Sequence, residues 1–269
     1  TFNRDQLKSS EAGLKYFVLS ALSSGLLLYG CSLIYGFTGS TNFDFISTQF
    51  NTNEYALTFG IVFVLVGLAF KISAVPFHMW APDVYEGSPT SVTLFFTMVP
   101  KIAALTVFIR FLYVPFLNLI DQWQIILVFI SIASMLFGAI AAIGQKNLKR
   151  LIAYSSISHI GYALAGLATG SNGGIQSSVV YMTIYIIMNL GFFSCLLMMK
   201  RNDIYYEQID DLSGLSKNHP LLSLSLLIIL FSLAGIPPLA GFFAKFYIFK
   251  SVIEQSMYFL AIVGLLSTV

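Results

Sequence analysis

Long apolar segments separated by short polar links run along the whole chain. A helix that crosses a membrane needs about 20 apolar residues, and this measure predicts about eight spans. Because most of the links are short, the spans should form a compact bundle of antiparallel neighbours. The predicted spans cover residues 11–36, 55–80, 89–114, 122–145, 147–169, 174–199, 219–250 and 255 onward.

Composition supports this pattern. Hydrophobic residues make up 57% of the 269 residues and charged residues only 10%, whereas soluble domains carry about 25% charged residues. We therefore predict an all-α polytopic membrane protein with one membrane domain over residues 1–269. Since the chain begins at Thr1 and ends inside an apolar run, we expect it to be part of a larger membrane protein, either as a fragment or as one half of a split gene.

Little in the sequence points to a bound cofactor. The two cysteines, Cys31 and Cys195, lie inside apolar segments, where cysteine packs as a small hydrophobic residue. There is no haem motif, cysteine cluster or phosphate loop, so we expect no metal or cofactor on this chain. The net charge is +2 and no long basic run is present, so nucleic acid is not an expected partner.

Basic residues are unequally divided between the two ends of the predicted spans. Cytoplasmic links are enriched in lysine and arginine, and the links on the side of Thr1 contain most of them. We therefore expect the Thr1 side to face the cytoplasm or the mitochondrial matrix. The basic residues of this side are Arg4, Lys8, Lys146, Lys149, Arg150, Lys200, Arg201 and Lys217, against Arg110 and Lys250 on the other side.

Two apolar segments carry a lysine beside residues that break helices. Lys71 lies about sixteen residues into the second span, past the middle of the bilayer at about 1.5 Å per residue, and Pro76 follows it. In the seventh span Pro237 and Pro238 precede Lys245. Interrupted membrane helices mark ion sites and often occur in pairs related by inverted repeats. We predict a break and a functional charge in both spans, with an ordinary structural ion pair as the alternative for Lys71.

Two other titratable residues are predicted near the middle of their spans. Lys101 follows Pro100 in the third span, and a lysine at that depth costs about 2.5–3.5 kcal/mol on insertion scales. His159 lies midway along the fifth span. Hydroxyl groups around it can pass protons or simply satisfy a buried histidine, and the residues alone leave both interpretations open. These hydroxyls belong to Ser155, Ser156, Ser158 and Tyr162.

Polar side chains also share helix faces in two other spans. Glu11 and Lys15 are four residues apart in the favourable order for an ion pair, and they are either a surface anchor or a functional pair. Tyr181, Tyr185 and Asn189 recur every four residues, so they predict a polar stripe that faces protein rather than lipid.

Four motifs together resemble the antiporter-like membrane subunits of respiratory complex I, most closely the smallest, N-type group (NADH dehydrogenase subunit 2). They read KISAVPFHMWAPDVYEGSPT, MVPKIA, KRLIAYSSISHIGY and LAGIPPLAGFFAKFY. The resemblance covers nearly the whole chain. It implies a fold of about fourteen helices with inverted repeats, of which the chain includes the end of the first repeat, about 1–115, and most of the second, about 120–269.

The resemblance also implies roles for single residues and partners. Lys71, Lys101, His159 and Lys245 would form a proton relay, with Glu11 and Lys15 opening it. The family's buried glutamate, the expected partner of Lys71, lies on a fifth helix that the sequence does not include. We therefore expect another chain or a missing segment to supply the first five helices, next to other membrane-arm subunits and lipids.

The expected function is proton translocation by a non-redox subunit of NADH:ubiquinone oxidoreductase, driven by quinone reduction in other subunits. NADH, FMN, iron–sulfur clusters and ubiquinone would be bound by those subunits. A non-pumping structural subunit and a subunit of a sodium/proton antiporter complex are the alternatives. The expected location is the mitochondrial inner membrane, with the bacterial cytoplasmic membrane as the alternative.

Overall fold

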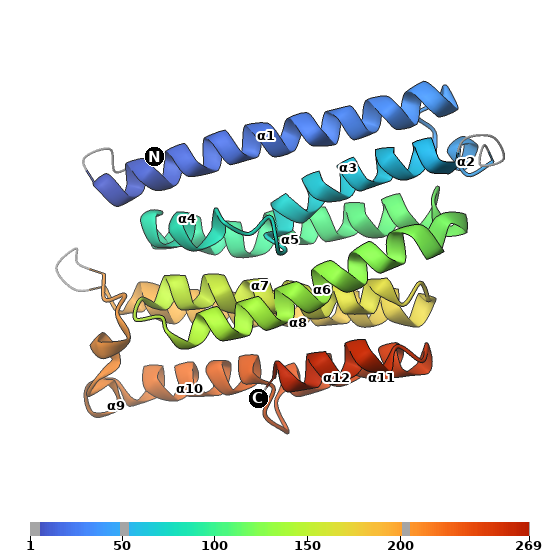
Figure 1. The fold of residues 1–269 in the computed structure, drawn as a ribbon. Coiled ribbons are helices and arrows are strands. Elements are labelled where there is room, and N and C mark those ends of the chain that lie inside the picture. Colours follow the sequence, from blue (N-terminus) through green and yellow to red (C-terminus); the bar gives the residue numbers. More distant parts are fainter. Residues whose placement is uncertain (1–5, 49–53, 201–204, 269) are drawn as a thin grey trace.

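The protein is a bundle of helices that lie side by side, with α1 along one edge and α10 to α12 along the other (Figure 1). The computed structural model describes residues 6–48, 54–200 and 205–268, so the predicted basic residues Arg4 and Arg201 lie outside the described parts. Within these parts, every regular element is helical apart from one isolated β-bridge. The prediction of an all-α fold is confirmed.

Six helices in the described residues are long and apolar enough to cross a membrane. They correspond to six of the eight predicted spans, with ends that differ by a few residues except at the end of α3. These helices are α1 (Leu7–Thr38), α3 (Glu54–Ile72), α5 (Thr90–Tyr113), α6 (Ile120–Ile143), α7 (Leu148–Ala168) and α8 (Asn172–Met198).

The second predicted span is interrupted, and its helical part is shorter than expected. Helix α3 ends at Ile72, where Ser73 adopts a left-handed φ of 59°, and helix resumes only in the short α4 (Ala81–Gly87). The helix therefore ends before Pro76, which was predicted as the point of the break, and the left-handed Ser73 follows its last residue. The predicted break in the second span is confirmed, but it begins a few residues earlier than Pro76.

The seventh predicted span is interrupted at its prolines, as expected. Helix α10 (Pro220–Ala234) ends at Gly235, which has a φ of 89°, and α11 (Ala240–Glu254) begins after Pro237 and Pro238. Each half has 15 residues, or about 22 Å, which is too short to cross a bilayer alone. The break is therefore a feature of one span made of two half-helices.

The two interrupted spans run in opposite directions across the bundle, α3 to α4 one way and α10 to α11 the other (Figure 1). Inverted repeats have this relation, although the repeat limits near residues 115 and 120 stay a prediction. The remaining short elements lie in the links or at the end of the described chain. They are α2 (Phe43–Ile46), a 3-10 turn at Leu117–Leu119, another at Ile209–Leu212, α9 (Leu215–Asn218) and α12 (Tyr258–Leu266).

Helix α7 forms the centre of the bundle. Of its most apolar window, 83% is buried inside the protein, against 17% for α1 at the edge. Helices α6, α8 and α11 pack against it. Small residues allow close contacts between these helices, because a Cβ added to Gly138 of α6 would lie only 2.5 Å from the backbone nitrogen of Ser158. The polar residues of α7 therefore face protein and not lipid.

Candidate functional site

Lys101 lies inside the protein, held by groups that carry no formal charge. Its side chain projects from α5 and is 0% exposed. The ammonium Nζ donates a 2.7 Å hydrogen bond to the hydroxyl of Ser156 on α7 and lies 5.5 Å from the ring centre of Tyr85 on α4. The predicted deep position of Lys101 is confirmed, and Tyr85 is a neighbour that the sequence interpretation did not include.

His159 lies one turn beyond Ser156 on the same helix and is also buried. Its Nδ1 is 2.6 Å from the hydroxyl of Tyr181 on α8, and its ring centre is 4.9 Å from that of Tyr185. The hydroxyls predicted around His159 have other partners: that of Ser156 accepts from Lys101, and that of Ser158 donates to the carbonyl of Met135. The partner of His159 therefore comes from the predicted polar stripe of α8, which is buried as expected.

Lys245 is buried at the second helix break. Its Nζ donates a 2.9 Å hydrogen bond to the carbonyl oxygen of Ala234, the last residue of α10. The same ammonium lies 5.1 Å from the ring centre of Tyr162, whose ring centre is 6.2 Å from that of His159. A cleft of about 330 Å³ is lined by His159, Tyr162 and Lys245.

These residues lie in one row across the core, in which Ser156 and His159 are separated by one turn of α7. It runs from Lys101 on α5 through Ser156, His159 and Tyr162 on α7 to Lys245 on α11. Tyr162 and Tyr181 place hydroxyl groups along the row. The structure thus brings together three of the four residues that the motifs predicted for a relay.

Lys71 lies outside this row and is less buried than its position in the sequence suggested. It occupies the last turn of α3, and its half-buried ammonium donates a 3.1 Å hydrogen bond to the hydroxyl of Ser20 on α1. The ring centre of Tyr16 is 5.8 Å away. No ion pair among the described residues includes Lys71. The expected pairing of Lys71 with a glutamate from another segment stays a prediction.

An aromatic cluster occupies the space between Lys71 and the row. Tyr16 packs against Trp80 with ring centres 5.1 Å apart, and Trp80 lies 6.3 Å from Tyr85, the residue that covers Lys101. Aromatic side chains from α1, from the break after α3 and from α4 thus lie between Lys71 and Lys101.

Glu11 and Lys15 form the predicted pair but belong to a larger network. The Lys15 Nζ is 2.5 Å from Glu11 and 2.7 Å from Asp83 on α4. Arg150 of α7 contacts Asp83 at 2.8 Å and Glu86 at 3.0 Å. The network joins α1, α4 and α7 at the end of the bundle where α1 begins (Figure 1). It identifies Asp83, Glu86 and Arg150 as residues that the sequence interpretation missed.

These partners lower the pKa of the two carboxyl groups of α4. Helix α4 is not among the helices long enough to span a membrane. Partial burial acts to raise the pKa of the Asp83 carboxyl, but hydrogen bonds from Lys15 and Arg150 outweigh it and hold the pKa below its ordinary value. The pKa of Glu86 is lowered in the same way, with burial opposed by hydrogen bonds from Lys8 and Arg150. Both groups are therefore held in the charged form at neutral pH.

Comparison with known proteins accounts for this architecture. Residues 1–269 match the family described as NADH:quinone oxidoreductase/Mrp antiporter, transmembrane. The chain is 84% identical over 269 residues to NADH-quinone oxidoreductase subunit N of Pelagibacter ubique, an alignment that covers 100% of this chain and 57% of the relative. This similarity confirms the predicted likeness to N-type subunits. The chain spans little more than half the length of that relative.

Two solved structures contain chains that share this fold. A chain of respiratory complex I from Thermus thermophilus with bound aureothin superposes with a TM-score of 0.83 at 34% identity, covering 98% of this chain and 57% of that one. A chain of the Mrp complex from a Dietzia species superposes with a TM-score of 0.89 at 27% identity, covering 97% and 48%. The chain therefore belongs to the NADH:quinone oxidoreductase/Mrp antiporter family of membrane proteins.

Proposed function

We propose that this chain is the proton-translocating part of an antiporter-like membrane subunit of NADH:quinone oxidoreductase. The observation that carries the proposal is the buried row from Lys101 through His159 to Lys245. Burying one lysine in a membrane protein is costly. Two lysines on either side of a histidine are difficult to explain by packing alone, and they suit the passage of a proton along the middle of the membrane.

Each residue of the row has a distinct task in this proposal. Lysine can lose its proton when its surroundings change, whereas arginine stays charged. Lys101 would pass a proton towards Ser156, and His159 would accept and release it because an imidazole ring can bind and lose a proton at its nitrogens. Lys245 would then carry the charge at the second break. Moving one charge against 100 mV costs about 2.3 kcal/mol, which quinone reduction in other subunits would supply.

The partners in this proposal are the other membrane-arm subunits, the helices that supply the glutamate partner of Lys71, and surrounding lipids. The enzyme activity belongs to the whole complex, with this chain in a non-redox role. We place NADH, FMN, the iron–sulfur clusters and ubiquinone in other subunits.

The proposed location is the bacterial cytoplasmic membrane, with the start of α1 on the cytoplasmic side. The relative from Pelagibacter ubique supports the bacterial alternative over the mitochondrial membrane that the sequence led us to expect. Lys8, Lys146, Lys149, Arg150 and Lys217 support the orientation, because the helix ends and links that carry them lie at the same end of the bundle (Figure 1).

The test is a charge-preserving substitution in the assembled complex. Lys101→Arg keeps the charge but removes an exchangeable amine, so we expect proton pumping to fall at least tenfold while the complex still assembles. Lys250→Arg is the matched control, because Lys250 is an exposed lysine paired with Glu254 at 3.8 Å. Normal pumping by Lys101→Arg would contradict a relay and favour a structural, non-pumping subunit.

A sodium/proton antiporter subunit is the second candidate, favoured by the similarity to a chain of the Mrp complex. The two functions differ in the ion that is moved. Pumping by the complex should be independent of sodium if protons pass along the row. A requirement for sodium in the same vesicles would support the antiporter alternative.

A further inference from the structure

Helix α4 depends on other elements for its position. It covers only Ala81–Gly87 and is separated from α3 by the non-helical residues 73–80. Isolated helices shorter than about 12 residues are marginal, so contacts from neighbours must hold α4 in place. Those contacts decide where its side chains lie.

The buried face of α4 covers Lys101. Tyr85 is 0% exposed, and its ring centre lies 5.5 Å from the Lys101 ammonium, within the range of about 6 Å for a cation–π contact. Thr93 of α5 donates a 3.0 Å hydrogen bond to the backbone carbonyl of Tyr85. A displacement of α4 would therefore move the ring away from Lys101.

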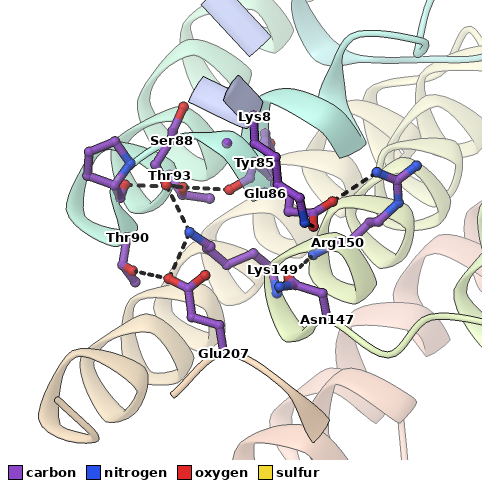
Figure 2. Close-up of polar contacts among 12 residues, drawn as sticks. Lys8, Tyr85, Glu86, Ser88, Thr90, Thr93, Asn147, Lys149, Arg150 and Glu207 are labelled. Atoms are coloured by element: carbon purple, nitrogen blue, oxygen red, sulfur yellow. Dashed lines mark hydrogen bonds and ion pairs between the residues drawn. The ribbon is translucent and has the colours of Figure 1, made fainter. Parts of the chain in front are cut away.

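Lys149 holds the carboxyl end of α4. Its Nζ donates a 2.9 Å hydrogen bond to the carbonyl of Ser88, the residue that caps α4, and contacts the carboxylate of Glu207 at 2.8 Å. Figure 2 shows the ammonium between these two groups. A cation at this position is favourable, because the carboxyl end of a helix carries partial negative charge.

The contact is built from several elements. The Lys149 side chain is only 4% exposed, although lysine is normally solvated unless it is paired. Glu207 accepts a 3.0 Å hydrogen bond from Thr90 at the start of α5, and its backbone carbonyl accepts a 2.7 Å hydrogen bond from Leu148. Lys149 thus joins the end of α4 to the start of α7 and to the segment after α8.

We propose that Lys149 is a positioning residue for the buried row: by holding the carboxyl end of α4, it keeps Tyr85 over the Lys101 ammonium and shields that amine. The proposal concerns how the Lys101 amine is shielded by Tyr85, and it therefore rests on the proposed function. Lys149 itself lies at the start of α7, and its hydrogen bond to the carbonyl of Ser88 connects it to α4 and so to Tyr85.

The test measures the shielding of Lys101 directly in the assembled complex. Acetic anhydride labels accessible neutral amines, and mass spectrometry of the peptide that contains Lys101 gives its labelling rate. Lys149→Met should raise this rate about tenfold, since a buried hydrogen bond to a charged group is worth about one decade in an equilibrium constant. Hydrogen exchange of the α4 amides should rise with it. Lys149→Arg keeps the cation and should restore both values towards those of the native protein.

A matched control and a milder variant complete the test. Lys146→Met removes an exposed lysine from the same link and should leave Lys101 labelling unchanged. If Lys149→Met fails to assemble, Glu207→Gln removes the negative charge of one of the two partners and should raise labelling by a smaller factor. Unchanged labelling in an assembled Lys149→Met or Glu207→Gln complex would overturn the proposal. The proposed function would still stand, because its own test is the pumping of Lys101→Arg.

Discussion

The Lys245 ammonium donates a 2.9 Å hydrogen bond to the carbonyl oxygen of Ala234, so a residue of α11 closes the end of α10. The last carbonyls of a helix have no partner inside it and carry the negative end of the helix dipole. The break at Gly235 therefore creates an acceptor for a cation within the protein. The end of α10 and the Lys245 ammonium are therefore joined by a hydrogen bond, so the position of each depends on the other.

This relationship predicts that Gly235→Ala disturbs Lys245. A Cβ at position 235 would lie 3.0 Å from Cδ of Lys245, and Gly235 has a φ of 89°. An L-residue in a left-handed conformation costs roughly 1–2 kcal/mol. We expect a lower thermal midpoint of the assembled complex and reduced proton pumping, measured as acidification of inverted vesicles.

Gly25→Ala is the matched control for this substitution. Gly25 lies in α1, and a Cβ there would meet nothing within 4 Å. Alanine is also the better helix former by about 1 kcal/mol. The control should therefore keep or slightly raise stability. Equal behaviour of the two variants would show that Gly235 does not position Lys245.

The hydroxyl of Tyr181 is predicted to matter more than that of Tyr185. The hydroxyl of Tyr181 lies 2.6 Å from Nδ1 of His159, whereas the buried hydroxyl of Tyr185 has no hydrogen-bond partner among the described residues. Tyr181→Phe should cost about 1 kcal/mol of stability and lower pumping, because His159 loses its orienting partner. Tyr185→Phe keeps the ring against His159 and should change stability little. A larger loss in Tyr185→Phe would contradict this order.

Acid should weaken the network around Asp83. A carboxyl whose pKa is lower in the folded protein stabilises the fold above its ordinary pKa, and that contribution is lost as the pH falls towards the lowered value. The pKa of Asp83 is lowered by Lys15 and Arg150 against the effect of burial. Asp83→Asn should therefore be less stable than the native protein at pH 7, and the difference should begin to shrink below about pH 4 and disappear only below the lowered pKa of Asp83.

Thermal midpoints of the assembled complex between pH 7 and acid would check this prediction. Asp44→Asn is the control, because Asp44 is an exposed carboxylate on α2. Its pH profile should follow that of the native protein. Parallel profiles for Asp83→Asn and the native protein would rule out the contribution of the network.

Much of the fold follows from local pattern. The third predicted span, 89–114, differs from α5 (Thr90–Tyr113) by one residue at each end. Apolar length sets such boundaries, and the prolines at 237 and 238 identify the second break. The end of α3 was misplaced because the backbone leaves the helix at Ser73, where the freed amide of Val75 finds the hydroxyl of Ser134 on α6. No local pattern reveals that partner.

The site was predicted in part for the same reason. Depth along a helix placed Lys101 in the core, since rise per residue is fixed. The partners of α4 lie far away in sequence, as in the pairs Asp83–Arg150 and Lys149–Glu207. A short charged helix after a proline resembles a surface link until its neighbours are known. Helix α4 becomes part of the site through its tertiary contacts, which composition does not reveal.

Lys71 gives the last prediction, which concerns its partner. Its described hydrogen bond goes to the hydroxyl of Ser20 at 3.1 Å. A hydrogen bond of this kind contributes about 1 kcal/mol, or a factor of about five. If a glutamate from another segment is the main partner, as we propose, Ser20→Ala should reduce pumping by no more than this factor. Lys71→Met should abolish pumping.

The comparison needs a control on the same helix. Ser24→Ala removes an exposed hydroxyl one turn further along α1 and should behave as the native protein. Pumping by the three variants is compared at equal amounts of assembled complex. If Ser20→Ala is as damaging as Lys71→Met, the hydroxyl is the essential partner, and the proposed glutamate is not needed to hold the charge. If Ser20→Ala stays near the control, Lys71 needs an acceptor stronger than a neutral hydroxyl, because an uncompensated buried charge would cost several kcal/mol.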